Sequence, residues 1–347
     1  MLFPVKNLMM RLLGNISAMA ELPLPFSKTA LSYIDIGARG GPPSHWLKLG
    51  QQMNYLCFEP DPAEAEALRL VFSRTPDFRG AVSECALGAT SASAALYLTH
   101  SRPCSSLLKP NSDLLNMFVH RDLFRVEQEL SLQTGTLDAE LQRLGAVSDF
   151  IKIDVQGYEL EVLKGGEQAV SNSIGCELEV SFIEIYKNQP LFAEVDQWMR
   201  ARGFFLADLE RIWWRRAAAP PEIHQRGALA YGNAIYLKSS ITDPTSTSSA
   251  CKSAIICVAL GLHELAYQIV AQAERGRLFS LEEAQGFGLW LQHHQRSTIF
   301  WHYLAHTLRA LPGRQTLARW LGLWSNCLQG NRDADSDANS WNRKNSW

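Results

Sequence analysis

The segment DFIKIDVQGYELEVLKGG, residues 149–166, decides the fold class of this chain. It begins with a short apolar run that ends at Asp154, as a buried strand does, and Gly157 then permits a tight turn into a helix. Lys152 and Asp154 stand within this strand, where charges are costly unless they are paired. Open α/β sheets bind ligands at the carboxyl ends of their strands, so we expect both residues at a functional site.

The same alternation of strand and helix extends from residue 31 to residue 240 and predicts an α/β fold. The expected strands are residues 32–36, 54–59, 81–86, 150–154, 177–185, 204–209 and 234–237. The expected helices are residues 43–51, 62–73, 157–169 and 192–202. No helical pattern separates the last two strands, which favours an antiparallel hairpin at the edge of a mostly parallel sheet.

The remainder of the chain predicts smaller parts around this domain. We expect an N-terminal helical segment over residues 1–30, a polar linker over 241–250 and a helical appendage over 251–325. The polar tail, residues 326–347, is predicted to be disordered. The apolar stretch at 254–262 is far shorter than the ~20 residues that a membrane span needs, so we expect a cytoplasmic protein.

Charge and cysteine content exclude several function classes. Lys and Arg number 33 against 35 Asp and Glu, which gives a formal net charge of −2 and no basic patch for nucleic acid. The seven cysteines are scattered without a C-x-x-C pair, so we expect reduced thiols and no structural zinc.

A second informative segment is YIDIGARGG, residues 33–41, in which an apolar strand runs into a glycine-rich turn. Glycines let the backbone approach a ligand closely, although such turns are often purely structural. The pattern is D-x-G-x-x-x-G and lacks the G-x-G-x-x-G of dinucleotide-binding folds. Asp35 precedes the first glycine, and its carboxylate would suit a ligand that carries an ammonium group.

The next expected strand ends in FEPDP, residues 58–62, with Glu59 at its terminus. Glu59 follows Gly37 by 59 − 37 = 22 residues, close to the ~20 typical of an acidic residue that binds a ribose diol. Asp61 is suited to capping the helix that starts near residue 62. We therefore expect Glu59 to contact a nucleoside.

Together these motifs resemble the FkbM-like methyltransferases over about residues 31–240. The matching segments are IDIGARGG (34–41), FEPDP (58–62), ECALG (84–88), Ser105–Ser106–Leu107, DFIKIDVQGYELEVLKGG (149–166) and the strand-helix-strand pattern of 177–209. The K-x-D-x-x-G-x-E signature is the most specific of them. Arg39 departs from the family, whose members often carry Asn in the glycine turn.

The resemblance implies a Rossmann-like class I methyltransferase sheet and S-adenosylmethionine (SAM) as the cofactor. It further implies O-methylation of a hydroxyl group on a sugar, polysaccharide or secondary metabolite. The residues then expected to bind SAM are Asp35, Gly37, Ala38, Arg39, Gly41, Glu59, Asp61, Ala86 and Leu87. The expected partner is a small-molecule or glycan acceptor, and a homo-oligomer is possible.

Four residues are candidates for catalysis: Asp154, Lys152, Glu159 and Glu179. A hydroxyl group is a poor nucleophile, so a base should help, and Asp154 is the leading candidate. Lys152 could neutralise Asp154 or orient the acceptor, whereas Glu159 is equally well explained by its place at a helix start. Glu177 and Glu179 are two residues apart and so share one face of their strand, and one of them could join Asp154. That pair could hold Mg²⁺, but no His accompanies it, and we expect no required metal.

Two other functions stay open at this point. One is an NAD-dependent oxidoreductase on a Rossmann sheet, which the missing G-x-G-x-x-G disfavours. The other is a catalytically silent, methyltransferase-like scaffold that binds partners through residues 251–325. Asp35, Glu59 and Asp154 are all present, which argues against lost catalysis.

Overall fold

The computed structural model describes residues 22–43, 46, 49–75, 78–220 and 227–294. Within these ranges the chain divides into two compact units. The larger unit comprises residues 30–241, and the smaller one comprises residues up to 29 together with those from 242 onward.

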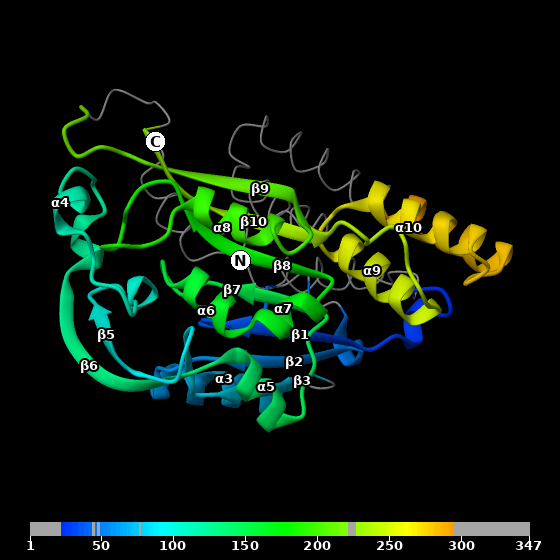
Figure 1. Cartoon of the computed structure of the whole chain (residues 1–347), viewed down its shortest axis with the longest axis horizontal. Helices are drawn as coiled ribbons and strands as arrows, with labels where there is room; N and C mark the ends of the chain where they lie inside the picture. The colour runs from blue at the N-terminus through cyan, green and yellow to red at the C-terminus, as the bar shows by residue number, and fades with distance from the viewer. Residues whose placement is uncertain (1–21, 44–45, 47–48, 76–77, 221–226, 295–347) are drawn as a thin grey trace, which may run out of the picture. The chain divides into compact units, whose positions relative to one another are not determined.

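A seven-stranded sheet forms the centre of the larger unit, in the order β3-β2-β1-β7-β8-β10-β9 (Figure 1). Its strands are β1 (Leu31–Ile36), β2 (Met53–Phe58), β3 (Arg79–Ser83), β7 (Phe150–Ile153), β8 (Gly175–Ser181), β9 (Phe204–Trp214) and β10 (Ala228–Lys238). All neighbours from β3 to β8 are parallel, while β10 runs antiparallel to both β8 and β9. The predicted α/β fold with an antiparallel edge hairpin is therefore confirmed.

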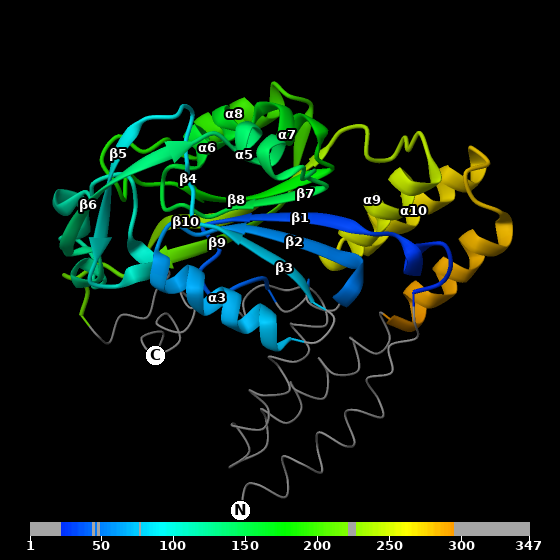
Figure 2. The same ribbon diagram turned by 90° about the horizontal axis from the view of Figure 1, so that it is seen from below.

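Helices cover both faces of this sheet (Figure 2). One face carries α5 (Leu137–Leu144), α6 (Glu159–Gly165), α7 (Glu167–Asn172) and α8 (Phe192–Arg200). The opposite face carries α3 (Pro62–Arg74). Successive strand residues point to opposite faces, so Ile34, Ile151 and Leu178 join the hydrophobic core beneath α5 to α8.

The alternate strand positions point to the other face, and their side chains change from aromatic to charged along the strands. Near the strand starts they are aromatic, and the Tyr33 ring centroid lies 5.7 Å from Tyr55 and 5.8 Å from Phe150. Two residues further along, Asp35 is paired in register with Lys152, and Lys152 with Glu177. The carboxyl ends of the strands therefore present a row of charges, whereas their starts are apolar.

Several expected boundaries differ from the structure. The expected helix 157–169 is two helices, α6 and α7, which meet at Gly166, where φ of −118° and ψ of 29° interrupt the helical backbone. Both glycines at this junction are tightly packed. A Cβ at Gly165 would overlap the backbone oxygen of Gly88, and one at Gly166 would lie 2.7 Å from Leu137 Cδ2. The expected strand 177–185 ends at Ser181.

Two further expectations fall near the start of the domain. The expected strand 81–86 is divided into β3 and a short strand β4 (Ala86–Leu87), which pairs outside the main sheet. Of the expected helix 43–51, the structure describes only part, and it ends in the 3-10 turn η2 (Gly50–Gln52). Residues 44–45 and 47–48 lie outside the described ranges.

A second sheet, in the order β4-β6-β5, is built mainly from residues 93–135, for which the sequence predicted no element. Its longer strands are β5 (Ser93–Thr99) and β6 (Val126–Gly135), which are antiparallel to each other. Between them lie η3 (Arg102–Cys104), α4 (Ser112–Leu115) and η4 (Arg121–Phe124). Side chains of these turns form a separate core with Tyr186, Ile212 and Trp214.

The smaller unit is helical. It contains η1 (Phe26–Lys28), α9 (Thr247–Ala259), α10 (His263–Arg275) and a helical stretch at 281–294. The Phe26 ring packs on Phe279 and Phe287, with centroid distances of 5.2 and 4.5 Å. Helix α9 begins within the expected linker, and the expectations for residues 1–21 and 295–347 lie outside the described residues. No helix within the described ranges is long and apolar enough to cross a membrane.

Candidate active site

The glycine turn after β1 touches the strands on either side. Gly37 has φ of +79°, and a Cβ at this position would overlap the backbone carbonyl of Asp154 at the end of β7. The amides of Gly37 and Ala38 donate to the carbonyl oxygen of Phe58 at the end of β2, at 2.9 and 3.4 Å. Only glycine fits at residue 37, because both its φ and its close neighbour exclude a side chain.

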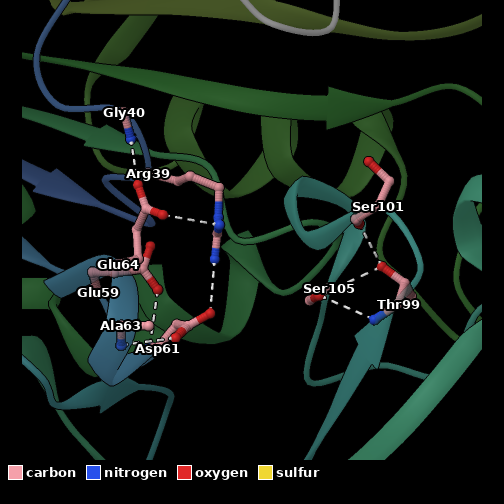
Figure 3. A network of polar contacts seen from close by, with 9 residues as sticks. All are labelled: Arg39, Gly40, Glu59, Asp61, Ala63, Glu64, Thr99, Ser101 and Ser105. Atoms are coloured by element: carbon pink, nitrogen blue, oxygen red, sulfur yellow. Dashed lines mark hydrogen bonds and ion pairs between the residues drawn. The ribbon is translucent and has the colours of Figure 1, made fainter. Parts of the chain in front are cut away.

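Arg39 fastens this turn to the start of α3 (Figure 3). Its guanidinium contacts Asp61 Oδ2 and Glu64 Oε2, both at 3.0 Å. Glu64 Oε1 also accepts from the amide of Gly40 at 3.2 Å, and Asp61 Oδ1 caps α3 by accepting from the amide of Ala63 at 3.0 Å. Arg39 and Asp61, both expected at the cofactor, therefore contact each other in this structure.

Gly41 completes the same turn. It has φ of +79°, and its amide donates to the carbonyl oxygen of Ala38 at 2.9 Å. Ala38 itself is buried. The expected cofactor turn is thus a closed backbone loop whose shape depends on left-handed glycines.

Glu59 lies at the end of β2 and is only 5% exposed. Its Oε1 accepts from the amide of Asp61 at 3.0 Å, and within the described part of the chain its Oε2 accepts no hydrogen bond. Burial raises the pKa of Glu59 to about 7, although the Asp61 amide and the Arg39 charge both act to lower it. Glu59 thus offers one carboxylate oxygen as an acceptor.

The close-up in Figure 3 also includes the turn that follows β5. The Thr99 hydroxyl donates to the carbonyl oxygen of Ser101 at 2.7 Å, and the Thr99 amide donates to Ser105 Oγ at 3.1 Å. These bonds hold the Ser105–Ser106–Leu107 stretch that resembles the family. The next residue, Ser106, reaches the end of β7, as described below.

Asp35 is completely buried in β1. Its Oδ2 accepts from the Tyr55 hydroxyl at 2.7 Å, and its Oδ1 lies 3.5 Å from Lys152 Nζ. Burial raises the pKa of Asp35, against the influence of Lys152 and the Tyr55 hydroxyl. The carboxylate that we expected to meet a ligand ammonium is therefore already engaged by the protein's own ammonium.

Lys152 connects the buried and the accessible carboxylates. Its Nζ lies 3.8 Å from Asp154 Oδ2 in addition to the contact with Asp35. Burial opposes the charged form, but Asp35, Asp154, Glu177 and Glu179 together hold the pKa of Lys152 above its ordinary value. Lys152 is therefore a fixed positive charge and not a proton donor.

Asp154 and Glu179 are joined by the side chain of Gln156, a residue that the sequence analysis does not single out. Gln156 Nε2 donates to Asp154 Oδ1 at 2.9 Å and to Glu179 Oε2 at 2.8 Å. Burial and the nearby charge of Asp154 raise the pKa of Glu179 well above its ordinary value. The only sequence signal for Gln156 is an amide residue directly before Gly157 in the turn after the strand.

Glu159 is buried at the start of α6. Its Oε1 accepts from the amides of Val155 and Gly157, both at 3.0 Å. Burial raises the pKa of Glu159 to about 7, and its hydrogen bonds to the backbone act in the opposite direction. These contacts favour the structural interpretation of Glu159, which holds the turn that carries Gln156.

The remaining expected residues, Ala86 and Leu87, form the short strand β4. Leu87 packs its side chain into the core beneath α5 to α8, and Ala86 pairs with Thr134 in the small sheet. Among the described residues, no group of three or more His, Cys, Asp or Glu could hold a metal ion. Between Asp154 and Glu179, where Mg²⁺ was an alternative, lies the amide of Gln156.

Comparison with solved structures gives distant similarities. A protein assigned as an RNA methyltransferase from Pyrococcus horikoshii is 9% identical, with 62% of this chain and 79% of that chain covered and a TM-score of 0.29. One assigned as a tRNA (m1A22) methyltransferase from Streptococcus pneumoniae is 10% identical, with coverages of 89% and 96% and a TM-score of 0.29. MtNAS in complex with MTA and tNA is 11% identical, with coverages of 66% and 59% and a TM-score of 0.28. Similarity at this level transfers no function to this chain.

The family comparison is more direct. No curated protein sequence matches the chain. The profile of the methyltransferase FkbM domain, however, matches residues 35–206, from the end of β1 to the start of β9. This range contains Gly37, Glu59, Lys152, Asp154 and Glu179. Residues 35–206 of this chain therefore belong to the methyltransferase FkbM domain family.

Proposed function

We propose that this domain transfers a methyl group from SAM to a hydroxyl oxygen of a sugar, a polysaccharide or a secondary metabolite. One observation carries the proposal: the carbonyl of Asp154 packs against the Cα of Gly37. The turn expected to hold the cofactor and the carboxylate expected to act on the acceptor are therefore in backbone contact. Methyl transfer needs such proximity, because alignment of the reacting groups contributes ~7–11 kcal/mol.

The residues present fit SAM at its nucleoside end. A buried ribose needs an acceptor for its hydroxyl groups, and Glu59 is buried with Oε2 free of hydrogen bonds from the described residues. When bound, SAM supplies an electrophilic methyl group on a sulfonium centre. The turn at Gly37 to Gly41 supplies a close backbone approach beside it, and Arg39 keeps that turn in place through α3.

On the acceptor side, Asp154 has the position and exposure for a base. Its side chain is 31% exposed, whereas Asp35 is wholly buried. Asp154 takes the proton of the acceptor hydroxyl as that oxygen becomes bonded to the methyl group, and later releases it to water. Lys152 Nζ lies 3.8 Å from Asp154 Oδ2 and holds the carboxylate from one side. Glu159 fixes the backbone of the turn that follows.

Calorimetry on the full chain tests the cofactor, with SAM, S-adenosylhomocysteine and NAD⁺ titrated separately. We expect binding of the first two and no binding of NAD⁺. Transfer of a radiolabelled methyl group from SAM to a panel of monosaccharides and polysaccharides then tests the reaction. Binding of NAD⁺ in preference to SAM would support the oxidoreductase alternative, and SAM binding without transfer to any acceptor would support the scaffold.

A further inference from the structure

We propose that Gln156 is a positioning residue that holds Asp154 and Glu179 together as a carboxylate pair sharing one proton. The proposal rests on the proposed function only where it names Asp154 as the base. The pair itself is a property of the protein without cofactor or acceptor. It can therefore be tested in the absence of both.

The geometry places one amide nitrogen between two carboxylates. Gln156 Nε2 lies 2.9 Å from Asp154 Oδ1 and 2.8 Å from Glu179 Oε2. A primary amide has two N–H donors, so both are used here, one on each carboxylate. The two carboxylates come from neighbouring parallel strands, β7 and β8, and the amide connects them across the strand ends.

The orientation of this amide is set by the carboxylates, because a carboxylate oxygen that carries no proton can only accept and so must face the NH₂ group. Gln156 Oε1 then faces the Tyr186 hydroxyl, which lies 2.9 Å from it and 2.9 Å from the carbonyl oxygen of Cys104. Burial raises the pKa of Tyr186 well above its ordinary value, so the hydroxyl stays protonated and shares its one hydrogen between these two oxygens.

The backbone of Gln156 is also fixed by its neighbours. Its φ is +58°, in the left-handed region that a residue with a side chain rarely adopts. The Ser106 hydroxyl donates to its carbonyl oxygen at 2.7 Å, and Glu159 binds the amides on both sides of it. A strained conformation persists only where its surroundings determine it, and such residues cluster at functional sites.

The charges around the pair explain why it keeps a proton. Lys152 is the one cation beside it among the described residues, and Lys152 also neutralises Asp35. The other titratable groups that interact with the pair are the acids Asp35 and Glu159, the phenols Tyr186 and Tyr231, and the Cys104 thiol. Two adjacent carboxylates with so little positive charge do not both ionise readily.

Gln156 acts on this balance in a predictable direction. Hydrogen bonds donated to a carboxylate favour its ionised form and lower its pKa. The amide therefore limits how far burial raises the pKa of Glu179. Without the amide, the shared proton should stay on the pair up to a higher pH.

The test is a pH titration of the carboxylic acid C=O band of the full chain by infrared difference spectroscopy, without SAM or acceptor. Glu179→Gln assigns the band. In Gln156→Ala we expect its midpoint to rise by about one pH unit, a tenfold change in proton affinity. Gln156→Gly removes the same amide but suits a left-handed φ, so it should fold well and show the same shift. Gln168→Ala, at an exposed glutamine of α7, is the matched control and should leave the midpoint unchanged.

Tyr186→Phe gives an independent measurement, because it releases the amide oxygen without removing the amide. We expect a smaller shift in the same direction. Unchanged midpoints in Gln156→Gly and Tyr186→Phe would overturn the proposal, and so would a wild-type protein without a protonated carboxyl group at neutral pH. A failure to bind SAM would overturn the proposed function and leave this result intact.

Discussion

At two corners of the domain, a planar donor side chain bridges two carboxylates, but the two bridges differ in charge. At the β1–α3 corner, the planar guanidinium of Arg39 bridges Asp61 and Glu64, with both contacts at 3.0 Å. At the β7–β8 corner, the planar amide of Gln156 bridges Asp154 and Glu179 at 2.9 and 2.8 Å. In each case one planar donor group joins two carboxylates at strand or helix ends.

The difference lies in the charge of the bridge. A guanidinium is always positive and attracts both of its carboxylates, which makes a static clamp. An amide is neutral and adds no positive charge to the second pair, in which burial and the charge of Asp154 raise the pKa of Glu179. We infer that the first corner holds the shape of the glycine turn at residues 37–41. We infer that the second corner is where the acceptor hydroxyl would give up its proton.

The largest effect should follow from neutralising the reactive corner. Asp154→Asn keeps the shape of the side chain and removes the base, and general-base catalysis contributes typically ~10²–10⁴-fold. We expect turnover to fall by about that factor while the Kd for SAM stays nearly constant, since a base acts in the transition state. Turnover and calorimetry on the same preparation measure both. Full activity of the Asn variant would show that Asp154 is structural.

The next effect concerns the contact between the corners. Gly37→Ala places a Cβ against the carbonyl of Asp154 at φ of +79°, so it should lower the free energy of unfolding by at least about 2 kcal/mol. Gly40→Ala is the matched control, because Gly40 has φ of +82° and open space around it. It should cost only the ~1 kcal/mol of a left-handed alanine. If urea denaturation gave equal losses of unfolding free energy for both variants, the backbone around Asp154 would be able to shift and accommodate the added Cβ.

Much of the fold was predictable because the strand signals are local. Strands β1, β2 and β7 are short, largely apolar runs followed by Gly37, Glu59 and Asp154, and the order of strands and helices then determines the fold class. The β5–β6 sheet was missed for the opposite reason. Strand β6 is exposed over most of its length, so it carries no apolar period by which to recognise it.

The sequence predicted the strand ends that carry the candidate residues, but not all of their pairings. Lys152 was expected near Asp154, and the structure adds the contact of Lys152 with Asp35. Which charges neutralise each other depends on side-chain geometry across segments far apart in the chain. Arg39 with Asp61, and Gln156 with Glu179, are separated by 22 and 23 residues, and no local pattern reports such contacts.

A moderate effect on binding should follow at Glu59. Glu59→Gln keeps the acceptor for the Asp61 amide but loses the charge, and a hydrogen bond to a charged group is worth ~1.5–3 kcal/mol, so SAM affinity should fall by about tenfold or more. Because the pKa of Glu59 is raised to about 7, wild-type SAM affinity should also decrease as pH falls through 7. The Gln variant should lack this pH dependence in calorimetry between pH 6 and pH 8, a window chosen around the ~7 value. An affinity loss below twofold would reject the ribose assignment.

The same substitution predicts a stability change with a definite sign. The unfolded Glu59 titrates near 4.5 and the folded one near 7, so the folded state binds more protons between these values and loses stability as pH rises through them. Glu59→Gln removes this loss. Its Tm relative to wild type should therefore be higher at pH 8 than at pH 4.5, a comparison that differential scanning calorimetry makes directly.

The smallest effect should come from opening the static clamp. Both Arg39 ion pairs are partly exposed, with side chains about a quarter accessible, and such pairs contribute ~0.2–1 kcal/mol each. Arg39→Gln should therefore lower the free energy of unfolding by about 1 kcal/mol, less at high salt, and change the Kd for SAM by less than about threefold. Arg143→Gln, which opens an exposed pair with Glu140 on α5, is the control and should change the Kd not at all. If Arg39 instead contacts the cofactor, as its place in the glycine turn suggested, the affinity would fall more than tenfold with little change in stability. The ratio of the two losses thus decides whether this corner binds SAM through its arginine or only shapes the turn that does.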